Sequence, residues 1–310
     1  MTEPDRKFLK CEGGFALRQC RICGIPETVD GVKLDESGVC RACRRQIRHI
    51  PSRRELREEV RKALENSEKV LVAVSGGLDS LAALGLALRI CDEVVALTVD
   101  TGALHPEAWR RIILARRRSD IRWEIIGDQE PFLKLFEERL TRAESPCGPC
   151  SRMITRRYER RARELGVDAI VTGHELPHGT SPVVPKDPPV IRAMCGMTEN
   201  KRQDIVEEEF GLTVDKISGY TSNCVVLPFA LKLFYMKYGY SFEAPRLAAM
   251  VRYGYISRED IEQIMTPPTL SDLKKLLREC EEWVPEILKQ MLQKAINKIS
   301  NSDLGRENGG

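Results

Sequence analysis

The chain has 310 residues, of which 42% are hydrophobic and 31% are charged. This length and composition predict a globular protein with a central domain of about 150 to 200 residues and smaller attachments. No run reaches the roughly 18 apolar residues of a membrane span, and the charged residues 1–10 lack the apolar region of a signal peptide. We therefore expect a cytoplasmic protein with no membrane partner.

Six of the eleven cysteines fall in three Cys-x-x-Cys pairs, which in a cytoplasmic protein indicate metal or redox chemistry. Two of the pairs, Cys20 with Cys23 and Cys40 with Cys43, have the spacing of a four-thiolate Zn²⁺ site. We expect residues 1–50 to form a zinc-binding knuckle that folds with the metal, because so short a unit cannot build a core of its own. The knuckle either contacts RNA or packs on the core.

The net charge of +3 is too small to indicate a nucleic-acid partner, but the arginines are unevenly distributed. They crowd into two segments, which hold Arg41, Arg44, Arg45, Arg48, Arg53, Arg54, Arg57 and Arg61, and then Arg152, Arg156, Arg157, Arg160, Arg161 and Arg163. Each segment either meets phosphates or forms a solvated helix face.

The middle of the chain alternates short apolar strands with helices. After a charged linking helix at residues 51–67, strands are expected at 69–74, 93–99, 122–126 and 168–171, and helices at 78–90, from about 105, at 132–140 and at 151–165. This order predicts an α/β fold with a doubly wound parallel sheet and ligands at the carboxyl ends of the strands.

We assign this core domain to residues 68–227. The proline-rich residues 176–190 are expected to form a loop and a candidate lid. Residues 228–300 read as a helical C-terminal region, and residues 301–310 as a disordered tail.

The sequence Ser-Gly-Gly-Leu-Asp-Ser at residues 75–80 stands where the first strand enters a helix. Gly76 and Gly77 allow close backbone approach to a phosphate, the amides of the helix start attract anions, and Ser75 and Ser80 add hydroxyl donors. Asp79 would lie beside phosphates only with a divalent metal, which indicates Mg²⁺. The alternative is a tight turn in which Asp79 serves as a cap.

This motif resembles the signature SGGxDS of the PP-loop ATP pyrophosphatases, which split ATP between the α and β phosphates. The resemblance implies that ATP binds at Ser75, Gly76, Gly77, Asp79 and Ser80, with Asp79 taking part in catalysis. Asp100 and the turn at residues 101–102 are placed to line the same pocket, and residues 99–102 also resemble phosphoadenylyl sulfate reductases. Gly173 and His174 follow the last strand and either help to hold ATP or are structural.

Cys147 and Cys150 form the third pair, just before the second arginine-rich helix. The helix dipole and the arginines are expected to lower the pKa of both thiols, and thiolates bind soft metals or attack sulfur. Residues 145–152 and 168–174 are similar in order and spacing to the tRNA thiolases of the TtuA and TtcA kind, and Cys224 lies where that family has a third cysteine. The likeness covers about residues 20–230.

The resemblance implies a [4Fe-4S] cluster held by Cys147, Cys150 and Cys224, with one iron free to hold sulfide. A persulfide mechanism and a structural zinc half-site are the alternatives. Two departures from the family stand out: Glu175 follows His174 where an Asn and paired aspartates are usual, and the C-terminus has only Cys280 in place of a second cysteine-rich module.

We expect an ATP-dependent tRNA sulfurtransferase that adenylates a pyrimidine carbonyl oxygen and replaces it with sulfur from sulfide or a carrier protein. A PP-loop enzyme that thiolates or amidates a small molecule is the second hypothesis. A zinc-bearing RNA-binding protein with a regulatory or inactive nucleotide site is the third. Similar enzymes are commonly homodimers.

Overall fold

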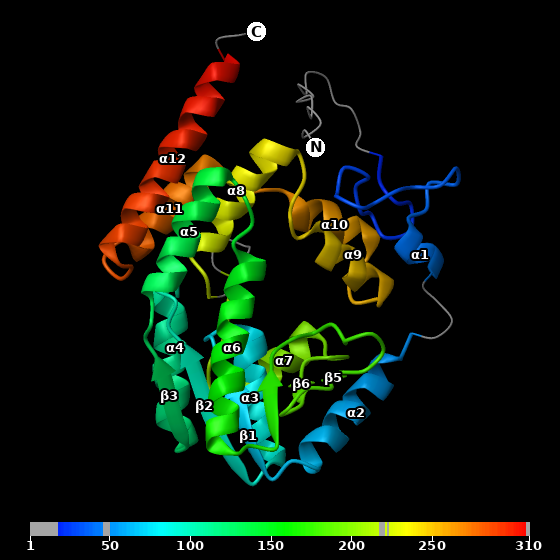
Figure 1. Ribbon diagram of the computed structural model, residues 1–310, viewed down its shortest axis with the longest axis vertical. Helices are drawn as coiled ribbons and strands as arrows, with labels where there is room; N and C mark the ends of the chain where they lie inside the picture. The colour runs from blue at the N-terminus through cyan, green and yellow to red at the C-terminus, as the bar shows by residue number, and fades with distance from the viewer. Residues whose placement is uncertain (1–17, 46–49, 217–220, 222, 308–310) are drawn as a thin grey trace, which may run out of the picture.

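The computed structural model describes residues 18–45, 50–216, 221 and 223–307. Its centre is one six-stranded sheet in the order β3-β2-β1-β4-β6-β5 (Figure 1). The strands are β1 (Lys69–Ala73), β2 (Glu93–Val99), β3 (Arg122–Ile126), β4 (Ala169–Thr172), β5 (Val183–Val184) and β6 (Val190–Arg192). Every neighbouring pair is parallel except β5 with β6, so the expected parallel sheet is confirmed.

The central strands are buried on both faces. In β1, Leu71 and Ala73 join one hydrophobic cluster, and Val70 and Val72 join the other. A strand covered on both sides reads as a continuous apolar run, which is why residues 69–74 are recognisable in the sequence.

Helices cover both faces, as a doubly wound fold requires. One face carries α2 (Arg53–Glu65), α3 (Leu78–Ile90), α4 (Pro106–Ser119) and α7 (Glu199–Phe210). The other carries α5 (Glu130–Arg142) and α6 (Cys147–Leu165). The linking helix expected at 51–67 is α2, and it packs on the sheet as part of the core.

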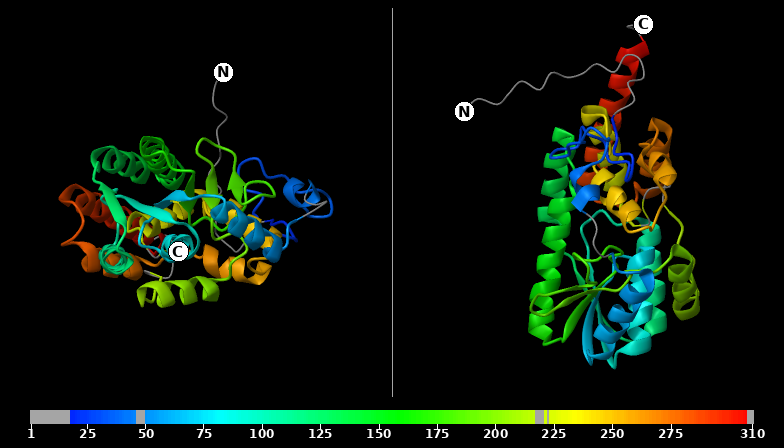
Figure 2. Two further views of the ribbon diagram at one scale, coloured as in Figure 1. Left: turned by 90° about the horizontal axis from the view of Figure 1, so that it is seen from below. Right: turned by 90° about the vertical axis from the view of Figure 1, so that its right-hand side faces the viewer.

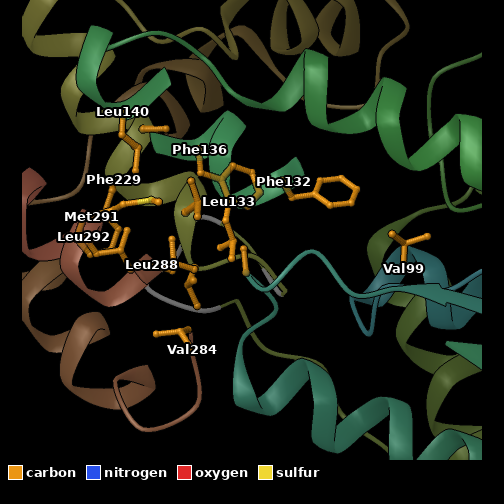
Figure 3. Close-up of a cluster of buried hydrophobic side chains, with 14 of the residues drawn as sticks. Val99, Phe132, Leu133, Phe136, Leu140, Phe229, Val284, Leu288, Met291 and Leu292 are labelled. Atoms are coloured by element: carbon orange, nitrogen blue, oxygen red, sulfur yellow. The ribbon is translucent and has the colours of Figure 1, made fainter. Parts of the chain in front are cut away.

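The C-terminal region is helical, as expected. It comprises α8 (Val226–Tyr238), α9 (Ala244–Arg252), α10 (Arg258–Met265), α11 (Leu270–Cys280) and α12 (Glu286–Glu307). Leu288 and Leu292 of α12 pack against Phe136 of α5 and Phe229 of α8 in one cluster (Figure 3). Helices α8, α11 and α12 therefore complete the core of the sheet domain.

The N-terminal unit is small and irregular, with α1 (Arg41–Arg45) as its one described helix. Isolated bridges join Gln19 to Pro26 and Leu34 to Cys40. The unit lies beside α9 and α10 and away from the sheet (Figures 1 and 2). Part of the knuckle assigned to residues 1–50, including Arg48, lies outside the described residues.

Three boundaries differ from expectation. Helix α6 begins at Cys147 and not at residue 151. Pro149 is tolerated in its first turn, because the backbone N–H that proline lacks would have no hydrogen-bond partner within the helix at that position. The proline-rich residues 176–190 contain the short β5. Helix α12 runs to Glu307, into the range expected to be disordered; residues 308–310 lie outside the described chain.

Replacing Leu292 by alanine tests whether α12 is part of the main core. Leu292 is fully buried, so we expect the free energy of unfolding to fall by about 2 to 5 kcal/mol. Lys294→Ala, on the exposed side of the same helix, should change it by less than about 0.5 kcal/mol. The free energy of unfolding is measured by chemical denaturation. Equal, small changes in the two variants would show that α12 is not part of the main core.

Candidate functional site

The loop at residues 75–80 has the geometry that the sequence predicts. Gly76 has a positive φ of 72°, and a Cβ there would lie 2.4 Å from the carbonyl oxygen of Ala108, so no other residue fits without movement. Arg111 donates through Nε to the Gly76 carbonyl at 2.8 Å. Ser80 Oγ donates to the Gly77 carbonyl at 2.9 Å and accepts from the Ser75 N–H at 3.1 Å. The Ser80 hydroxyl therefore holds the loop itself.

The first turn of α3 begins directly at this loop. Its N-cap is Gly77, and no side chain among the described residues caps it, so its leading N–H groups are directed toward whatever lies above the loop. Such a helix start favours an anion. Gly173, after β4, packs against the same turn, where a Cβ would lie 2.6 Å from the carbonyl carbon of Asp79.

Asp79 belongs to an ion-pair chain that includes two arginines. It pairs with Arg202 of α7, which is 8% exposed and also reaches Glu175 at 3.3 Å. Glu175 in turn pairs with Arg246 of α9 at 2.7 Å. Burial raises the pKa of Asp79, and the charge of Arg202 opposes that rise. A group that neutralises Asp79 is therefore already present, and a divalent metal would compete with it.

Arg202 and Arg246 were not predicted from the sequence. Both lie on helices far along the chain, where an arginine looks like an ordinary surface residue. The one available signal was Glu175, an acidic residue directly after the Gly173-His174 dipeptide.

Asp100 and His174 lie at the carboxyl ends of β2 and β4, as expected, and both have internal partners. Asp100 accepts from the Gly102 N–H at 2.9 Å and from the side-chain amide of Gln129, so it shapes the turn after β2. His174 Nδ1 lies 2.9 Å from the Thr172 hydroxyl. Burial and the nearby Arg192 lower the pKa of His174, which is therefore neutral at pH 7.

The three cysteines expected to act together lie on or next to two helices, α6 and α8. Cys147 and Cys150 lie in the first turn of α6, and Cys224 precedes α8. The charge of a Cys224 thiolate raises the pKa of each of the other two, and Cys150 and Cys224 pack against the same hydrophobic cluster. Leu104 and Cys224 form a backbone bridge, so the segment with Cys224 is attached to the loop after β2.

The expectation of lowered thiol pKa values is wrong for this group. Burial raises the pKa of Cys147 and Cys224, and raises that of Cys150 to about 12, because desolvation outweighs the helix dipole and Arg157. The Cys224 sulfur accepts hydrogen bonds from the Val226 and Leu227 amides, which favour its thiolate. The unmetallated thiols are therefore protonated at pH 7.

Cys147, Cys150 and Cys224 supply three soft sulfur donors, which can serve as ligands of zinc or of an iron-sulfur cluster. Cys150 and Cys224 also pack against the main hydrophobic cluster.

The N-terminal cysteines have the geometry of a single tetrahedral site. Cys20 Sγ lies 3.8 Å from Cys43 Sγ, and Cys23 Sγ lies 3.8 Å from Cys40 Sγ. Zinc with Zn–S bonds of about 2.3 Å separates its sulfur ligands by about 3.8 Å. Although burial opposes it, backbone N–H groups lower the pKa of Cys20 to about 6, which favours a thiolate ligand. Cys20, Cys23, Cys40 and Cys43 can therefore hold a metal ion.

The arginine-rich helices are partly occupied by internal contacts. On α6, Arg157 pairs with Asp128, and Arg161 pairs with Glu124. On α2, Arg57 donates to the Gly196 carbonyl and Arg61 pairs with Glu58. Some of the arginines that the sequence suggested for phosphate binding are thus engaged in contacts within the fold.

Comparison with known proteins relates most of the chain to one relative. The uncharacterized protein MJ1599 of Methanocaldococcus jannaschii is 31% identical over 266 residues, which are 81% of this chain and 94% of that protein. The chain belongs to the family of this methanogen protein. Residues 69–174, from β1 through His174, match the phosphoadenosine phosphosulfate reductase domain.

Two enzymes are similar over a shorter part. The tRNA-cytidine(32) 2-sulfurtransferase of Polynucleobacter necessarius is 30% identical over 36% of this chain and 38% of its own length. A subunit of the glutamine-hydrolyzing GMP synthase of Methanococcus maripaludis is 30% identical over 39% of each chain. The membership in a PP-loop type of nucleotide-binding family is thus supported from several sides. None of the helices in the described part of the chain is long and apolar enough to cross a membrane.

Replacing Gly173 by alanine tests the packing of β4 on the α3 start. The added Cβ meets backbone atoms that cannot rotate away, so the loop at 75–80 must shift. We expect the affinity for ATP to fall by at least about tenfold in isothermal titration calorimetry. The matched control is Gly127→Ala, because a Cβ at Gly127 meets no atom within 4 Å. Unchanged affinity in both variants would contradict the assignment of the loop.

The N-terminal site predicts about one tightly bound zinc per chain. Cys40→Ser removes one of four clustered ligands, and we expect the purified variant to lose that zinc. Cys91→Ser, which lies outside any ligand group among the described residues, should keep it. Metal analysis of the two variants checks this directly, and a full complement of zinc in Cys40→Ser would exclude the site.

Proposed function

We propose that this protein is an ATP-dependent tRNA sulfurtransferase that releases AMP and pyrophosphate. The observation that carries the proposal is the backbone bridge between Leu104 and Cys224. It attaches the cysteine segment to the loop after β2, at the same sheet edge as the loop at 75–80 and Gly173. This attachment of Cys224 supports a site that combines a phosphate-binding loop with the thiols of Cys147, Cys150 and Cys224.

The first chemical step uses the loop at residues 75–80. The substrate carbonyl oxygen attacks the α-phosphorus of ATP, and pyrophosphate leaves with the electron pair of the broken P–O bond. The N–H groups at the α3 start would hold the phosphates, and Asp79 would be a ligand of Mg²⁺, which would compete with Arg202 for the carboxylate. Arg202 is then placed to neutralise phosphate charge.

The second step replaces oxygen by sulfur. A hydrosulfide attacks the activated carbon, AMP leaves with the former carbonyl oxygen, and loss of the proton leaves C=S. A [4Fe-4S] cluster would supply a site for that sulfide on its one iron that has no protein ligand. Cys147, Cys150 and Cys224 would be its ligands, and the bridge of Cys224 to Leu104 would hold the cluster near the loop after β2.

Several observations support a tRNA pyrimidine as substrate. The similarity to a tRNA-cytidine(32) 2-sulfurtransferase, at 30% identity over 36% of this chain, is one of them. The exposed arginines of α6, Arg152, Arg156 and Arg160, add positive charge suited to RNA phosphates.

A second candidate is an amide-forming or sulfur-inserting enzyme that acts on a small molecule. The match to a GMP synthase subunit, over nearly the same share of the chain, favours it. A persulfide carried by one of these three thiols, Cys147, Cys150 or Cys224, and resolved by another is a variant of the first proposal.

The deciding experiment is anaerobic purification followed by iron, sulfide and zinc analysis of the wild type and of Cys147→Ala. We expect about four irons and one zinc per chain in the wild type, with only the iron lost in the variant. The reconstituted wild type should release AMP and form thiolated nucleoside from unmodified tRNA, and Cys147→Ala should not.

Cys195→Ser serves as the control, because Cys195 is buried beside His174 and away from the thiols of Cys147, Cys150 and Cys224. Zinc without iron, combined with sulfur transfer, would favour the persulfide variant. Iron without any AMP release from tRNA would exclude the proposed substrate.

A further inference from the structure

The N-terminal metal unit is docked on the helix that reaches toward the nucleotide loop. Cys20, Cys23 and Cys40 form one buried cluster with Ala244 and Ala248 of α9. Figure 1 shows α9 and α10 between this unit and the elements of the sheet domain. Small residues on α9 allow the unit to approach the helix backbone closely, so the unit and the helix share one packed core.

Polar contacts fix the same interface. Arg252, at the end of α9, donates to the Cys23 sulfur at 3.6 Å. Arg258, at the start of α10, donates to the Arg21 carbonyl at 2.9 Å. Gly24 packs so closely that a Cβ would lie 3.1 Å from Ile261. One of the four candidate zinc ligands thus contacts α9 directly.

Another side chain of α9, Arg246, connects the helix to the nucleotide loop through ion pairs. Arg246 pairs with Glu243 at 2.6 Å and with Glu175 at 2.7 Å. Glu175 contacts Arg202, and Arg202 contacts Asp79. Arg252 and Arg246 lie less than two helical turns apart on α9. The ion pairs of Glu175 and Arg202 connect Arg246 to Asp79.

The turn after α9 is attached to the segment that follows β4. Tyr253 donates its hydroxyl to the Gly179 carbonyl at 2.6 Å, and the Gly196 N–H donates to the Tyr255 hydroxyl at 2.8 Å. Arg53 of α2 also donates to the Gly254 carbonyl. The position of α9 is therefore set from two sides, by the metal unit and by the sheet domain.

We infer that Arg246 is a positioning residue of the nucleotide site and that the N-terminal zinc unit acts on ATP binding by holding α9 in place. Arg246 fixes Glu175, which in turn holds Arg202 where phosphate charge arrives. This role is separate from any contact of the unit with RNA. It rests on the proposed function only in requiring that the loop at 75–80 binds ATP.

The test measures the dissociation constant of Mg·ATP by calorimetry on the full chain, without RNA. Arg246→Gln should weaken binding by roughly tenfold, and Arg246→Lys, which retains the charge, should restore part of it. Arg252→Gln keeps all four cysteines and should weaken binding by about threefold while zinc content stays unchanged. Arg18→Gln, at an exposed pair with Glu27 on the same unit, is the matched control and should bind as the wild type.

Cys40→Ser without zinc should bind Mg·ATP as weakly as Arg246→Gln does. Combining it with Arg246→Gln should cause little additional loss, because both changes release the same contact. A folded, zinc-free Cys40→Ser that binds Mg·ATP like the wild type would overturn the inference. Near-ultraviolet circular dichroism shows whether Cys40→Ser folds. If it does not fold, Arg252→Gln is the deciding variant, and Mg·ATP binding by Arg252→Gln with wild-type affinity overturns the inference. A wild type that binds no ATP would instead refute the proposed function.

Discussion

The site depends on one steric constraint, the close approach of the end of β4 to the first turn of α3. At Gly173 the two backbones leave no room for a side chain, and at Gly76 the loop lies equally close to α4. These contacts fix the direction of the α3 axis, so the free N–H groups at its start point at a defined position over the sheet edge. The loop after β2, and with it Cys224, is attached to the same edge.

Much of the fold could be predicted because its strands are unambiguous. Residues 93–99 and 122–126 were expected as strands and are β2 and β3 with those bounds, since short segments rich in β-branched and aromatic residues between helices have few alternatives. The start of α6 was missed because Gly148 and Pro149 suggest a turn, although both are tolerated where helix amides need no partner.

The site could be predicted only in part. Cys224 was joined to Cys147 and Cys150 by resemblance, because no sequence pattern relates cysteines so far apart, and their joint role stays a prediction. The pKa of these thiols was predicted in the wrong direction, since the sequence shows the arginines of α6 but not the apolar surroundings of the sulfur atoms. Arg202 and Arg246 need a tertiary structure to be recognised.

The core shared by α5 and α12 has a consequence for how the protein is made. Phe136 of α5 emerges from the ribosome long before Leu288 and Leu292, which join it in one hydrophobic cluster of the finished molecule. The N-terminal unit likewise meets Ala244 and Ala248 of α9 only after most of the chain has been synthesised. Nascent chains that stop short of α12 therefore leave an aromatic surface uncovered, which makes them targets for chaperones and prone to aggregation.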